Sequence, residues 1–156
     1  MPSVRRGGQL AFDGDPAEVL AAILEFLRSL PLGIFCPNRV LISHSTPAPN
    51  KTHDATVGIL QRASQRADLD RGGPVYQWVW GRGQTTDQLK RLGQRLDAEF
   101  FVLGHRKIDG GFEVFADRAI AVSSDSPSGC VLHFSTDEPL TPATAAQCVK
   151  QIALLA

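Results

Sequence analysis

Two short apolar runs, each ending in a histidine, constrain the fold of this chain more than any other feature of its sequence. The runs are RVLISH, which ends at His44, and FFVLGH, which ends at His105. Both are apolar at nearly every position, with many β-branched or aromatic residues, which is typical of buried strands. Because open α/β sheets place their sites at the carboxyl ends of strands, we expect the two imidazoles to converge there, close enough to share a metal ion.

These histidines also have a plainer interpretation. A histidine at the end of a strand is commonly a core residue whose ring is hydrogen-bonded to a backbone carbonyl. The occurrence of two such histidines on similar runs leaves packing and metal binding both open for the pair. The other two histidines are His53, near a helix start, and His133, within CVLHFS. We expect His53 to be solvated and His133 to lie on a sheet surface.

The periodicity of the sequence predicts helices around these strands. Asp15 and Pro16 form a helix start, because aspartate caps and proline fits the first turn. Residues 1–14 are expected to be a flexible lead-in. In chain order we expect helix 15–29, strand 40–44, a weakly periodic helix over 54–67, a short strand or aromatic-packed loop at 76–80, helix 85–96 and strand 99–103.

The last third of the chain indicates a different arrangement of strands. FEVFAD, AIAVSS and CVLHFS are short runs separated by Gly, Asp, Ser and Pro, which is the pattern of an antiparallel meander. Thr141 and Pro142 begin a last helix that is expected to reach about Leu155. We therefore predict a single α/β domain over residues 15–156, with a mixed β-sheet and flanking helices.

Composition limits the kind of partner that the chain can have. Its 156 residues carry 16 Lys and Arg against 16 Asp and Glu, so nothing favours nucleic acid or an anionic membrane surface. No apolar run approaches the roughly 20 residues of a membrane helix. The three cysteines show no CxxC spacing and are expected to be reduced thiols of a cytoplasmic protein.

Arg82 is a candidate for binding an anion. It lies in the sequence GRG, directly after the aromatic segment YQWVW. Glycines on both sides leave room for an anion to approach, and a guanidinium group binds phosphate through two parallel hydrogen bonds. An arginine in a surface turn is the simpler interpretation of the same residue.

In their order, these motifs resemble the C-terminal half of the calcineurin-like metallophosphoesterases, in particular the phosphoprotein phosphatase branch. That family has an apolar strand ending in histidine, a tryptophan-containing segment, and then a helix and a strand ending in Gly-His or Ala-His. The corresponding segments here are LISH, YQWVWGRG and LKRLGQRLDAEFFVLGH. GGFEVF and AIAVSSDSPSGCVLHF then match the family's glycine-aromatic-glutamate run and its closing strands. The resemblance covers roughly residues 38–135.

This resemblance implies a partial metallophosphoesterase β-sandwich and, in the complete enzyme, hydrolysis of a phosphomonoester or phosphoprotein. It implies that His44 and His105 bind one of two divalent metal ions (Mn, Fe or Zn) that activate a water molecule for attack on phosphorus. Arg82 would be the phosphate-binding residue of the active site, and a phosphorylated compound would be the substrate.

The first three motifs of the family are missing. Residues 1–37 contain neither Asp-x-His, nor Gly-Asp-x-x-Asp-Arg-Gly, nor Gly-Asn-His-Glu. Two imidazoles are fewer than the three or more protein ligands that usually hold a hydrolytic metal ion. We therefore expect the C-terminal portion of a phosphoesterase that is inactive alone, with an N-terminal half chain as a possible partner. The alternatives are a non-catalytic binding or scaffolding domain derived from this fold, and a small α/β domain whose histidines are only packed.

Overall fold

The computed structural model describes residues 15–154, which fall into two compact units divided between Pro31 and Leu32. In the first unit, α2 spans Pro16–Ser29. The Asp15 carboxylate accepts a hydrogen bond from the Ala17 amide at 2.9 Å and so caps this helix. The helix predicted from Asp15 and Pro16 is confirmed. The lead-in predicted for 1–14 lies outside the described residues, and the single domain over 15–156 stays a prediction.

The second unit is built on a mixed five-stranded sheet, which confirms the predicted fold class. Its strands, in spatial order, are β1 (Gly33–Phe35), β2 (Val40–Ser43), β3 (Phe100–Leu103), β5 (Ala119–Val122) and β4 (Phe112–Phe115). The three central strands are parallel, and the two outer strands run antiparallel to their neighbours. β1 was not predicted, because three residues are too few to establish an alternation.

Side chains of the central strands alternate between two buried clusters, one on each face of the sheet. The cluster on one face includes Leu41, Phe101, Leu103 and Ala119, and the cluster on the other face includes Val40, Phe100, Val102 and Ile120. Because both faces are covered, these strands read as continuous apolar runs in the sequence.

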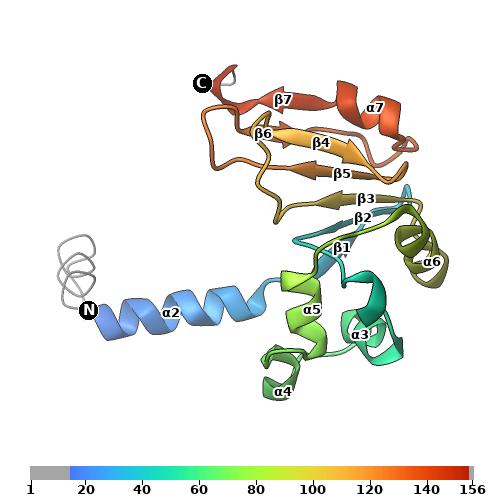
Figure 1. Ribbon diagram of the computed structural model, residues 1–156. Helices are drawn as coiled ribbons and strands as arrows, with labels where there is room; N and C mark the ends of the chain where they lie inside the picture. Colours follow the sequence, from blue (N-terminus) through green and yellow to red (C-terminus); the bar gives the residue numbers. More distant parts are fainter. Residues whose placement is uncertain (1–14, 155–156) are drawn as a thin grey trace. The chain divides into compact units, whose positions relative to one another are not determined.

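Short helices lie between β2 and β3 in the chain (Figure 1), and side chains of most of them belong to the first buried cluster. They are η1 (Pro49–Lys51), α3 (Asp54–Gly58), η2 (Ile59–Gln61), α4 (Arg66–Leu69), α5 (Pro74–Trp80) and α6 (Thr86–Leu96). α6 begins at Thr85, whose hydroxyl accepts from the Gln88 amide, and has the predicted bounds. The continuous helix predicted over 54–67 is wrong, because the backbone is extended at Arg62 and Gln65, between η2 and α4.

The aromatic segment at 76–80 is also helical, so the predicted short strand or loop is wrong. Gly73 caps α5, and Pro74 occupies its first position. Val75 and Trp78 are three residues apart and both buried, and the Trp78 indole donates to the Thr56 carbonyl at 2.7 Å. An apolar run of five residues is too short to distinguish a helical period from a strand period.

The C-terminal elements cover the second face of the sheet. β4 and β5 form the predicted antiparallel hairpin, but β6 (Cys130–Leu132) leaves the meander and pairs with β7 (Val149–Gln151) in a separate sheet. The last helix, α7, spans only Pro142–Gln147, so the helix predicted to reach about Leu155 is wrong. After it, the chain supplies the partner that β6 requires, and η3 (Ile152–Leu154) follows. Within residues 15–154, no helix has the length and apolar character needed to cross a membrane.

Candidate functional site

The site is built where β2 and β3 end side by side. These strands are parallel and pair Ser43 with Leu103, so the chain leaves both at the same edge of the sheet. The Gly104 amide donates to the His44 carbonyl at 3.1 Å, which extends the pairing by one residue. His44 Nε2 then lies 2.9 Å from His105 Nδ1, with 4.7 Å between the ring centroids. The predicted convergence of the two imidazoles is confirmed, whereas metal binding by them stays a prediction.

The backbone of His105 adopts the left-handed conformation, with φ 58°. This conformation costs a non-glycine residue about 1 kcal/mol or more, and such residues concentrate at functional sites. Here it turns the chain sharply at the end of β3, directly after Gly104.

The His105 ring is partly buried against aromatic side chains. Trp80 packs edge-on to it, with the centroids 5.4 Å apart, and Tyr76 stacks on Trp80. Burial, the positive charge of Arg82 and the neighbouring His44 together lower the pKa of His105. The ring is therefore neutral at pH 7, which is the form that binds a metal ion. Its Nε2 is buried and has no hydrogen-bond partner among the residues that the structure describes.

The loop after α5 is held against the end of β2. The Ser45 hydroxyl donates to the Gly81 carbonyl at 2.7 Å, and the Gln84 amide group reaches the same carbonyl and that of Thr46, each at 3.2 Å. A Cβ atom on Gly81 would lie 1.8 Å from the Thr46 carbonyl oxygen. Only glycine permits this close approach, which carries the adjoining Arg82 to the strand ends.

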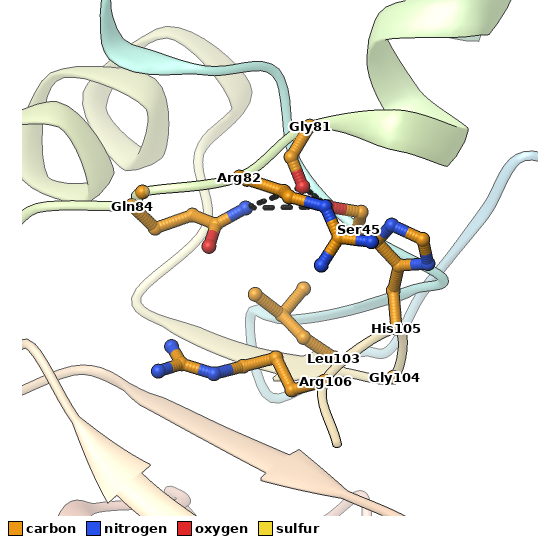
Figure 2. Close-up of a pocket in the computed structure, with 9 residues that line it drawn as sticks. Ser45, Gly81, Arg82, Gln84, Leu103, Gly104, His105 and Arg106 are labelled. Atoms are coloured by element: carbon orange, nitrogen blue, oxygen red, sulfur yellow. Dashed lines mark hydrogen bonds between the residues drawn. The ribbon is translucent and has the colours of Figure 1, made fainter.

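Arg82 and His105 line one pocket of about 210 Å³, shown in Figure 2. Its lining is completed by Ser45, Gly81, Gly83, Gln84, Leu103, Gly104 and Arg106. Among the residues that the structure describes, none with an acidic side chain lines the pocket. Within residues 15–154, the Arg82 guanidinium has no ion pair or hydrogen bond. The pocket is therefore positively charged and suited to an anion.

The remaining histidines are remote from this chemistry. His53 is an exposed residue at the start of α3, within 3.2 Å of the Thr56 hydroxyl. His133 is exposed directly after β6.

Sequence reasoning did not single out Gln84 or Arg106. Arg106 does follow His105 directly, but its use depends on contacts with β4 that the local sequence does not reveal.

The histidine pair can supply part of a metal site. Two nitrogen ligands bound at about 2.0–2.1 Å to one ion lie roughly 2.9–3.4 Å apart for bond angles between right and tetrahedral. The observed 2.9 Å falls within this range, and it also suits a direct hydrogen bond between the rings. Among residues 15–154 there is no group of three or more His, Cys, Asp or Glu side chains that could hold a metal ion. A complete centre would need further ligands from elsewhere.

The fold is mixed α/β, and comparisons with known proteins find a likeness among solved structures alone. No family model matches the sequence, and no curated protein matches it. Among solved structures, the chain is similar to a protein serine/threonine phosphatase from Saccharomyces cerevisiae, described as similar to human phosphatase PP5. The sequence identity is 18% and the TM-score 0.48. The match covers 66% of this chain and 38% of the yeast protein, so the chain spans less than half of that protein's length.

Proposed function

We propose that this chain is the C-terminal portion of a calcineurin-like metal-dependent phosphoesterase, in which His44 and His105 are two ligands of the metal centre. The observation that supports this most directly is the 2.9 Å separation of His44 Nε2 and His105 Nδ1 at adjacent ends of parallel strands. The order of the sequence motifs supports the same two histidines as metal ligands on separate grounds.

The neighbouring groups suit this role. A divalent ion, when bound, would supply an activated water molecule and stabilise charge on phosphoryl oxygens. The neutral form of His105 keeps its nitrogen available as a ligand, and Arg82 presents an uncompensated guanidinium to a phosphate in the same pocket. The further ligands would come from an N-terminal half chain, so this chain alone is expected to be inactive.

Metal titration with a matched histidine control tests the proposal. We expect calorimetry with Zn²⁺ or Mn²⁺ to show one weak site that is lost in His44→Ala and in His105→Ala and is retained in His133→Ala. No hydrolysis of p-nitrophenyl phosphate is expected with added Mn²⁺. Identical metal binding in all four proteins would overturn the ligand assignment. Metal-dependent turnover that vanishes in His105→Ala would overturn the claim that the chain is catalytically incomplete.

A second candidate function is a non-catalytic binding or scaffolding domain. The observation that favours it is that the central strands are covered on both faces by elements of residues 32–154 themselves. Such a domain is expected to be monodisperse and to unfold in one cooperative transition. An incomplete enzyme is expected to aggregate or to melt without cooperativity, so light scattering and a thermal melt of the full chain separate the two candidates.

A further inference from the structure

We propose that Arg106 is a second anion-binding residue of the pocket, and that it selects ligands with two neighbouring anionic groups, such as a diphosphate, over a single phosphate. The inference deepens the proposed function by naming the substrate class, and it rests on that function for the identity of the site. It depends on three features of Arg106: how its side chain is held, what charges surround it, and where it lies relative to Arg82.

The Arg106 side chain is held by two residues of β4. Its Nη2 lies 3.0 Å from a carboxylate oxygen of Glu113, and its guanidinium carbon lies 4.2 Å from the centre of the Phe115 ring. Glu113 and Phe115 are two residues apart on one strand and therefore share a face. These contacts fix a side chain that otherwise has many rotamers, so less freedom remains to be lost when a ligand binds.

The donors of Arg106 are only partly used. A guanidinium group carries five N–H donors, and Arg106 makes no hydrogen bond within residues 15–154 apart from its ion pair with Glu113. Glu113 does not line the pocket, whereas Arg106 does. Donors that Glu113 does not use therefore remain for a ligand in the pocket.

Arg82 and Arg106 reach the pocket from different segments and from opposite sides. Figure 2 shows Arg82 on one side, Arg106 on the other, and Leu103 between them. The pocket of about 210 Å³ is smaller than the roughly 300–1,000 Å³ of sites for drug-sized ligands. Because the two guanidinium groups lie on opposite sides of Leu103, a small ligand that offers one anionic group to each of them suits this arrangement, whereas an isolated phosphate offers a single anionic group.

The simpler alternative is that Arg106 only forms a surface ion pair. The Arg106 side chain is 35% exposed and that of Glu113 is 44% exposed, and pairs of this kind contribute little to stability. If Arg106 forms only this ion pair, any preference for the more highly charged diphosphate would persist in Arg106→Ala. The preference is therefore the property to measure.

The experiment is calorimetric titration of the full chain with inorganic pyrophosphate and, separately, with orthophosphate, without added metal. We expect wild-type protein to bind pyrophosphate about tenfold more tightly. Arg106→Ala should abolish this preference while changing orthophosphate affinity little, whereas Arg82→Ala should weaken both ligands. Arg95→Ala is the matched control, since Arg95 is also an exposed arginine paired with a carboxylate, that of Asp54, and it should change neither affinity.

Glu113→Gln provides a test in the opposite direction. Glutamine removes the competing negative charge and keeps a side-chain oxygen that can accept from Arg106, so pyrophosphate affinity should increase. This result does not depend on the folding of Arg106→Ala. Equal affinity for the two ligands in wild-type protein, absence of binding, or an unchanged preference in Arg106→Ala would each overturn the proposal. Because no metal is added, the result is separate from the zinc and manganese titrations. Pyrophosphate selectivity without histidine-dependent metal binding would overturn the proposed function and leave Arg106 as the selective residue of an anion-binding domain.

Discussion

Two basic pockets lie at opposite ends of the central strands, and they differ in how their arginines are neutralised. The second pocket, of about 400 Å³, is lined by residues at the amino ends of β2, β3 and β5, including Arg39, Glu99, Asp117 and Arg118. There Arg39 forms ion pairs with both Asp97 and Glu99. The pocket at the histidines is about half as large, and no acidic side chain of residues 15–154 lines it. Acidic side chains in the lining, rather than volume, therefore distinguish the second pocket from the candidate site.

The two ends of the strands also differ in why their residues adopt left-handed backbone conformations. Near the second pocket, Asp97 has φ 55° as the C-terminal cap of α6, and Ala116 and Asp117 have φ 53° and 55° between β4 and β5. Helix ends and tight hairpin turns commonly require such angles. His105 is left-handed without terminating a helix or turning a hairpin. Its conformation is better explained by the placement of its ring beside His44.

The largest effect is expected from closing the space between the Arg82 loop and β2. In Gly81→Ala, the added Cβ would lie 1.8 Å from the Thr46 carbonyl oxygen and 2.7 Å from that of Gln77, so the loop must move. We expect the free energy of unfolding to fall by about 3 kcal/mol, with loss of anion binding at the histidine pocket and no change at the second pocket. Urea denaturation and phosphate titration measure the two effects.

The control for this variant is Gly58→Ala. Gly58 is the last residue of α3, and a Cβ there would meet nothing within 4 Å. We expect unchanged or slightly increased stability. If Gly81→Ala were as stable as this control and still bound phosphate, the close approach of the loop to Thr46 would not be what positions Arg82.

A smaller effect is expected from removing the acids of the second pocket. The double variant Asp97→Asn, Glu99→Gln leaves Arg39 without its two carboxylate partners. Because these pairs are exposed, each should contribute less than about 1 kcal/mol to stability. We expect weak phosphate binding to arise at the second pocket, detected as shifts of the Lys90 and Gln94 amides in an NMR titration. Unchanged spectra would show that the two pockets differ in more than charge compensation.

Some of this site was predictable because its signals are local. The strands that carry His44 and His105 have apolar residues on both faces, and a run of three or four such residues can be recognised without knowing its partner strand. The helix caps at Asp15 and Thr85 are likewise set by neighbours within three residues. The convergence of the histidines then follows from two parallel strands ending together.

The unpredicted features depend on contacts between distant segments. β6 leaves the meander because its partner is β7, about twenty residues later in the chain. Arg106 has its pocket-facing role because Glu113 and Phe115 of β4 hold it. Pattern and spacing within a segment carry no information about either pairing, so sequence reasoning predicted the histidines and missed the second arginine.

The smallest effect is expected on the pKa of His105, which reports the charge of the histidine pocket directly. The pKa of His105 is lowered by burial, by Arg82 and by His44, so Arg82→Ala should raise it towards its ordinary value of about 6.5. Below that value the unfolded chain binds a proton that folded His105 does not, so stability rises with pH between the folded and unfolded pKa values. Arg82→Ala should make this rise shallower, whereas Arg39→Ala, at the other pocket, should leave it unchanged. Ring-proton NMR titrations and urea denaturation between pH 5 and pH 8 measure both quantities. An unaltered pKa of His105 in Arg82→Ala would mean that solvent screens the guanidinium from the imidazole, and the contrast between the two pockets would then lose its electrostatic basis.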